Sequence, residues 1–219
     1  MSNKWLWSAA RILAVLVLAA GAGALAQAPL PEHLSGNISD FTGVVSGAGP
    51  WEMRGHWSLH LKGNSGKADF SAYMTMELSD YGVQRVNKDP GVAANRGAHT
   101  HHIVMTDATA STDPTDLSAC PTFNPTNTPK LVVNGTAKFI SGNGNDAPFE
   151  KGGAATSMLQ VCITGSTDDQ PGVITPEVEY SNMTLVFGAP ANTHFGSDPV
   201  HGAVRFPHKD ADRDDGHRH

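Results

Sequence analysis

Three histidines within four residues are the part of this sequence best suited to chemistry. His99, His101 and His102 stand directly before the apolar run Ile103 to Met105. In an extended strand, residues two apart point to the same face with Cα atoms about 6.5 to 7 Å apart, so His99 and His101 face one side and His102 the other. Two imidazoles at this spacing can reach one zinc, copper, nickel or iron ion. The stretch therefore predicts one half of a metal site.

A complete site needs one or two further ligands, which must come from distant segments. We predict that His194, in Asn192-Thr-His-Phe-Gly196, and His201, in Asp198-Pro-Val-His-Gly202, are these ligands. A weaker set of residues could add alternative ligands or hydrogen bonds to the ligands, and it comprises Asp107, Asp198, His56 and His60. Zinc and copper are the metals that we expect.

Simpler roles for the same histidines compete with this prediction. His99 and His101 share their face with Ile103 and Met105, so they could lie at the rim of a core and bond to the backbone without a metal. The other candidates lie on an expected strand surface or in loops that contain Gly and Pro, where polar side chains often face solvent or close a turn. A structural β-domain without a metal therefore stays open.

One local pattern resembles a known family. His99-Thr-His101, followed by Cys120 and then by Phe123-Asn-Pro125, is similar to copper-zinc superoxide dismutase, whose copper site begins with His-x-His and whose disulfide cysteine precedes Phe-Asn-Pro. The pattern departs from that family at Thr122, where the family has its bridging histidine, and the next histidine after the stretch is His194. The resemblance covers a small part of the chain and assigns no family.

The N-terminus is typical of a secretory signal peptide. Lys4 and Arg11 flank a short polar start, the apolar run Ile12 to Ala20 follows, and Ala24-Leu25-Ala26 has the A-x-A pattern of a signal peptidase site. The apolar run is short for a membrane span. We predict cleavage after Ala26, which would leave a secreted or periplasmic chain that is not inserted in the membrane.

The charge balance narrows the class of partner. Cleavage would remove two basic residues and no acidic one, which leaves 13 basic against 21 acidic residues. The resulting net charge of about −8 argues against nucleic acid or an anionic membrane surface, because both are bound by clustered Lys and Arg. We therefore expect a metal ion or a small molecule as the partner.

The two cysteines, Cys120 and Cys162, are predicted to form a disulfide, because pairing is the default in an oxidising compartment. The bridge would close a loop of about 40 residues, which the chain-entropy model values at about 4 kcal/mol. Two separate buried thiols are the alternative.

Strands dominate the remaining pattern. From Ala68 to Leu78 apolar and more polar residues alternate strictly, whereas a helix would place Glu77 on its apolar face. Similar segments, separated by Gly, Pro and Asn, predict further strands at about Trp51 to Lys62, Ala98 to Thr106, Leu131 to Ile140, Ser157 to Thr164, Val178 to Phe187 and Ala203 to Phe206. About eight short strands with long loops and no long helix indicate an all-β fold, either a single antiparallel β-sandwich or a small β-barrel.

The chain is predicted to hold one folded domain, over residues 41–207. Residues 27–40 are expected to form an extended lead-in, and residues 107–129, rich in Thr, Pro, Asp and Asn, a long loop. Residues 208–219 are charged and lack apolar anchors, so we expect a disordered tail.

The sequence carries no strong catalytic motif. It lacks a Gly-x-Ser-x-Gly elbow, a His-Glu-x-x-His helix and a phosphate-binding loop, and a disulfide would remove the thiol nucleophiles. We therefore expect an exported, non-catalytic binding protein with a histidine-lined site for zinc, copper or a small ligand. A metal-dependent enzyme with an open coordination position is the alternative.

Overall fold

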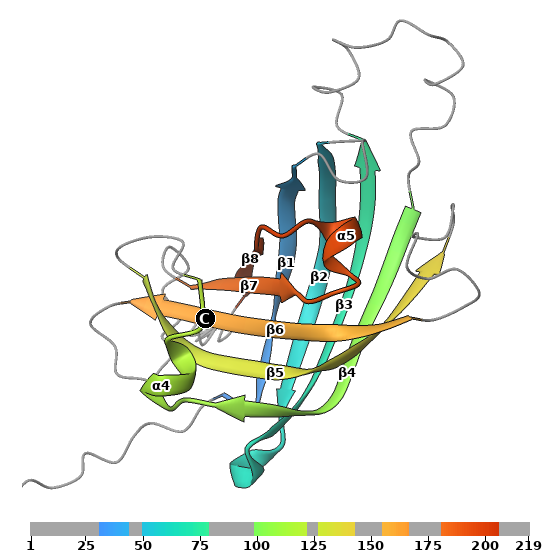
Figure 1. Cartoon of the computed structure of the whole chain (residues 1–219). Helices are drawn as coiled ribbons and strands as arrows, with labels where there is room; N and C mark the ends of the chain where they lie inside the picture. Colours follow the sequence, from blue (N-terminus) through green and yellow to red (C-terminus); the bar gives the residue numbers. More distant parts are fainter. Residues whose placement is uncertain are drawn as a thin grey trace, which may run out of the picture.

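Eight antiparallel strands close into one barrel in the computed structural model, which describes residues 31–43, 50–78, 99–121, 127–142, 155–166 and 181–205. Each strand pairs with its neighbours in sequence, and β1 pairs with β8 to close the ring (Figure 1). The strands are β1 (His33–Thr42), β2 (Trp51–Leu61), β3 (Lys67–Leu78), β4 (His99–Ser111), β5 (Asn127–Gly142), β6 (Ala155–Ser166), β7 (Asn182–Phe187) and β8 (Val200–Arg205). The all-β prediction is confirmed, with the barrel as its form.

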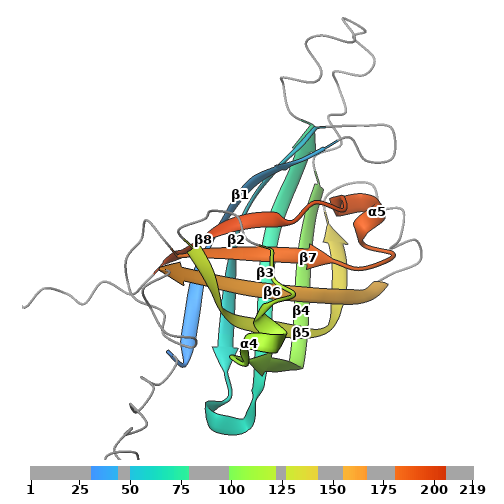
Figure 2. The same cartoon turned by 60° about the vertical axis from the view of Figure 1, so that its left-hand side comes forward.

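Helices in the described residues are short: η1 (Gly63–Ser65), α4 (Pro114–Leu117) and α5 (Asn192–Phe195). In Figures 1 and 2, α5 lies in the connection between β7 and β8, and α4 lies against the outside of β5. None of the helices among the described residues has the length and apolar character that crossing a bilayer requires.

Several boundaries differ from those predicted. The barrel begins with β1 at His33, inside the segment expected to be a lead-in. The sequence pattern does not reveal this strand because only Leu34 and Ile38 supply large apolar side chains to its inner face. β4 continues to Ser111 and α4 follows it, so the predicted loop is partly regular structure. The predicted signal peptide, the charged tail and residues 178–180 of one predicted strand lie outside the described residues.

Alternation along the strands fills the barrel with side chains. In β3, the inward residues Ala68, Phe70, Ala72, Met74 and Met76 are each exposed by 1% or less. This burial confirms the predicted strand, because every second residue faces the core.

β4 follows the same rule with histidines at its start. His99, His101, Ile103 and Met105 are buried, while His102 between them is exposed. The predicted division of the three histidines between two faces is therefore confirmed.

The seam between β1 and β8 depends on Gly36. The indole Nε1 of Trp57 in β2 donates a hydrogen bond to the carbonyl oxygen of Ala203 in β8, at 3.3 Å. A Cβ atom on Gly36 would lie 1.8 Å from that oxygen and 2.7 Å from Nε1. Any side chain at position 36 would clash with this oxygen and with the indole. The close pairing of β1 with β8 at this point therefore requires glycine.

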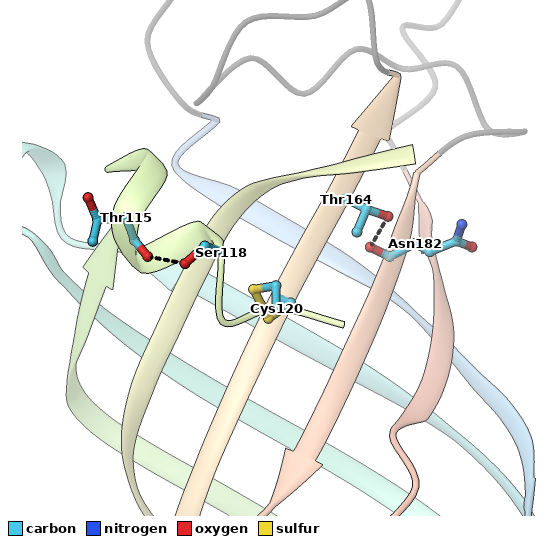
Figure 3. The surroundings of a disulfide bond; sticks show 6 residues. Thr115, Ser118, Cys120, Thr164 and Asn182 are labelled. Atoms are coloured by element: carbon cyan, nitrogen blue, oxygen red, sulfur yellow. Dashed lines mark hydrogen bonds between the residues drawn. A yellow bond between two sulfur atoms is a disulfide. The ribbon is translucent and has the colours of Figure 1, made fainter. Parts of the chain in front are cut away.

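A disulfide joins Cys120 to Cys162, with an S–S length of 2.01 Å and Cα atoms 5.9 Å apart. The bridge ties the segment after α4 to β6 (Figure 3). Cys120 and Cys162 form a small apolar cluster with Leu117 and Val132, separate from the interior of the barrel. The predicted pairing is confirmed, and its place is the outer surface of the barrel.

Candidate metal centre

The start of β4 and the helix α5 meet at one end of the barrel. In an antiparallel meander the starts of even strands and the ends of odd strands lie together, so His99 at the start of β4 lies at the same end as Phe187, the last residue of β7. α5 follows β7 and brings His194 back over this end.

Three imidazoles converge there. Nε2 of His194 lies 3.0 Å from Nε2 of His99 and 3.0 Å from Nε2 of His101. The potential ligand atoms of all three residues lie within 4.8 Å of one another. The three side chains are buried, with 5%, 0% and 8% exposure for His99, His101 and His194. Two groups among the described residues could hold a metal ion, and this is the one whose members are all buried.

The local structure of α5 sets the direction of His194. The backbone N–H groups of His194 and Phe195 both donate to the carbonyl oxygen of Ala191, at 2.9 and 3.0 Å. Gly196 follows with φ at 92°, a conformation that favours glycine, and the helix ends there. This single turn directs His194 and Phe195 together into the barrel.

Aromatic rings pack around the imidazoles. Phe195 stacks on Phe187 with ring centroids 4.3 Å apart and presents its ring to His101 at 4.9 Å. Trp51, at the start of β2, meets the ring of His99 edge to face at 5.7 Å. These rings make the surroundings of the cluster apolar and restrict the motion of the three imidazoles.

Ser141 of β5 fixes the orientation of His101. Its Oγ lies 2.9 Å from Nδ1 of His101, and the two residues are direct partners in the β4–β5 ladder. When Nδ1 of an imidazole carries the hydrogen and donates it to such an oxygen, Nε2 keeps its lone pair for a metal. In that tautomer, the contact would leave Nε2 of His101 available to a metal ion.

His201, the fourth predicted ligand, lies elsewhere. In β8 the neighbours Val200 and Gly202 face inward, so His201 faces outward, where its Nδ1 contacts Oδ2 of Asp40 at 2.8 Å. Its backbone N–H also donates to Asp40, at 2.7 Å. Partial burial raises the pKa of Asp40, but the hydrogen bonds from His201 and from the backbone of Phe41 outweigh it and hold this pKa below its ordinary value. The structure thus brings together three of the four predicted ligands.

The carboxylates proposed as further ligands also lie apart from the cluster. Asp107 sits at a bulge six residues beyond His101, about 20 Å along the strand. There it contacts Lys62 and donates its backbone N–H to Asp69 at 2.9 Å. Asp198 is exposed in the connection after α5 and is not part of the three-histidine group.

The two early histidines lie on β2. His56 is exposed and stacks with Tyr73 at 5.8 Å. His60 lies near the end of β2, at the other end of the barrel, with Nε2 3.4 Å from the carboxylate of Glu32. Neither belongs to the three-histidine cluster.

His60 belongs to a second group, with Glu32 and His33, whose ligand atoms are also within 4.8 Å of one another. Glu32 and His33 are exposed. The rings of His33 and His60 stack face to face, 4.4 Å apart and 7° from parallel. The in-plane lone pairs of parallel rings run side by side instead of converging, so this group is a poorer metal site than the buried one.

The predicted metal site does not include the supporting residues Ser141, Trp51 and Phe187. Ser141 and Trp51 are adjacent to the ligands only through strand pairing and barrel closure, which no local pattern reveals. Phe187 is predicted from the sequence only as the end of a strand, with no role in the site.

Comparisons of the chain with protein-family models, with curated proteins and with solved structures find no match.

Proposed function

We propose that this protein is an exported, non-catalytic binding protein for a transition metal, zinc or copper, held by Nε2 of His99, His101 and His194. The observation that carries the proposal is the convergence of three buried ring nitrogens from two distant segments. The disulfide is compatible with an extracytoplasmic location.

The nitrogen contacts favour a shared cation over a purely hydrogen-bonded cluster. An imidazole nitrogen carries either one N–H or one lone pair in the ring plane. Nε2 of His194 therefore makes at most one good hydrogen bond, yet two other Nε2 atoms lie 3.0 Å from it. A metal ion between the three nitrogens would satisfy all of their lone pairs at once.

The spacing also fits such an ion. Two nitrogens at 2.0 to 2.1 Å from one tetrahedral ion lie about 3.3 to 3.4 Å apart. The observed separations of 3.0 Å would have to open by a few tenths of an ångström. Rotations about the side-chain bonds of the histidines supply such a change without movement of the strands.

Elemental analysis of protein purified without an affinity tag tests the proposal, because a polyhistidine tag would bind metal itself. We expect about one equivalent of zinc or copper per chain, or saturable binding of one ion at micromolar concentration or below near neutral pH. Absence of both metals after purification, together with no binding in calorimetric titration of the metal-free protein, would leave the metal-free structural role as the function.

A metalloenzyme is the second candidate, and one observation favours it. Three histidine ligands leave a fourth position on a tetrahedral ion, the arrangement that catalytic zinc sites use for water or substrate. A general acid or base near the ion would also be needed, and neither Asp107 nor Asp198 lies in the cluster. Superoxide dismutase and esterase assays on the metal-loaded protein, with His99→Ala as the control, separate the two candidates. Activity that depends on His99 would establish the enzyme.

A further inference from the structure

Methionine side chains line the barrel beside the histidine cluster. Met76 of β3 is the direct ladder partner of His99 in β4, and Met74 is the partner of His101. Met53 of β2 pairs with Met76 on its other side. All three methionines face the interior and are 0% exposed. The two β4 ligands therefore stand directly against a row of thioether side chains.

The sulfur atoms of this row can approach an ion bound to the histidines. Residues directly opposite in an antiparallel pair have Cβ atoms about 4.5 to 5.5 Å apart on the same face. Methionine is unbranched and has three rotatable side-chain bonds, so its sulfur can adapt to a neighbouring group. Met74 and Met76 thus offer a donor from the barrel wall, on the side of the cluster formed by β3.

We infer that the ion is copper in its +1 state, bound by His99, His101 and His194 with a thioether sulfur from Met74 or Met76 as the additional donor. This inference rests on the proposed metal-binding function and names its metal. Soft thioether ligands select Cu(I), whereas zinc sites in proteins are built from imidazole, thiolate and carboxylate.

The charge of the site points in the same direction. No carboxylate of the described residues joins the three-histidine group, and the histidines are buried among aromatic and thioether side chains. Burial of an uncompensated ion is costly, and in the Born description the cost grows with the square of the charge. A monovalent ion therefore suits this site better than Zn²⁺ or Cu²⁺.

Competition with a chromophoric Cu(I) chelator under anaerobic, reducing conditions measures the predicted affinity. We expect the metal-free protein to take one equivalent of Cu(I) from the chelator. In the double variant Met74→Leu/Met76→Leu, the Cu(I) affinity should fall by about tenfold or more, the range seen when a group that supports a metal centre is lost. Zinc affinity of the same variant should change by less than about threefold, because thioether sulfur is not among the usual zinc ligands.

Met105→Leu is the matched control, because Met105 is an equally buried methionine of β4 that lies away from the cluster, with its sulfur beside Gly135. It should leave the Cu(I) affinity unchanged. Copper-edge X-ray absorption should show a sulfur scatterer in the parent protein and in Met105→Leu, and nitrogen scatterers alone in the double variant.

Failure of this inference is distinguishable from failure of the proposed function. Zinc binding without Cu(I) binding, or equal Cu(I) affinity in parent and double variant, would overturn the copper assignment and leave the metal site standing. Absence of any metal binding in the parent protein would overturn both.

Discussion

Nε2 of His101 lies 3.0 Å from Nε2 of His194, although 93 positions separate the two residues in the chain. Strand β4 supplies one and the single turn α5 supplies the other, at the same end of the barrel. Under the proposed function, metal binding would therefore depend on both segments.

Replacement of His194 by alanine should therefore abolish tight metal binding. The variant keeps only the His99 and His101 pair, and we expect the affinity to fall by more than the 10- to 100-fold that loss of a supporting group costs. His102→Ala is the matched control, since His102 lies on the same strand but is exposed and contacts Ser71 at 3.1 Å. Calorimetric titration of both variants measures the difference, and equal affinities would contradict the assignment of His194 as a ligand.

Ser141→Ala should weaken the site without removing a ligand. Loss of the Oγ contact removes one interaction that orients the ring of His101. We expect about a tenfold fall in metal affinity, with the same stoichiometry. Ser141→Thr keeps the hydroxyl group and should restore much of the affinity, which a general effect on packing would not predict. Titration of both variants with the same metal supplies the measurement.

Asp40 should make the barrel seam sensitive to acid. Its folded-state pKa lies below the unfolded value of about 3.9. The stabilisation is therefore complete above that value and is lost as the pH falls through the folded pKa. Asp40→Asn should lower the free energy of unfolding by about 1 to 2 kcal/mol at pH 7, and the difference should shrink toward pH 3.

Chemical denaturation of the metal-free protein across this pH range checks the prediction. Asp198→Asn serves as the control, because Asp198 is exposed, and it should change the stability by less than about 0.5 kcal/mol. A gap between parent and Asp40→Asn that stays constant from pH 7 to pH 3 would contradict the role of the Asp40 carboxylate.

The disulfide should stabilise the fold without influence on the metal centre. Cys120 and Cys162 are 42 positions apart, and the chain-entropy model gives about 4 kcal/mol for a loop of this length. We expect Cys120→Ser/Cys162→Ser to lose about this much in denaturant unfolding, and to keep its metal affinity under native conditions. The bridge lies in a separate apolar cluster outside the barrel, so a large change in affinity would show a coupling that the contacts do not indicate.

Strand periodicity sufficed to predict the half of the site that lies within one element. His99 and His101 are spaced by two and continue the row of Ile103 and Met105, and this spacing is a local property of the chain. The same reasoning applied to Val200, Gly202 and Val204 would have placed His201 on the outer face, but Gly202 hides the pattern in the sequence.

The remainder of the site depends on pairing that is not local. β1 and β8 meet only when the barrel closes, so the sequence could not decide between a sandwich and a barrel. Ser141 reaches His101 through the register of β4 against β5, which is shifted by a bulge between Val104 and Thr109. No pattern within either strand specifies that register.

The position of His194 after β7 also sets an order of events during synthesis. A nascent chain contains His99 and His101 early, and it lacks His194 until seven of the eight strands have been made. Before that point the three-histidine group is incomplete, although His102 and the earlier histidines are already present. Under the proposed function, the complete three-histidine site would form only after the chain has been made through α5.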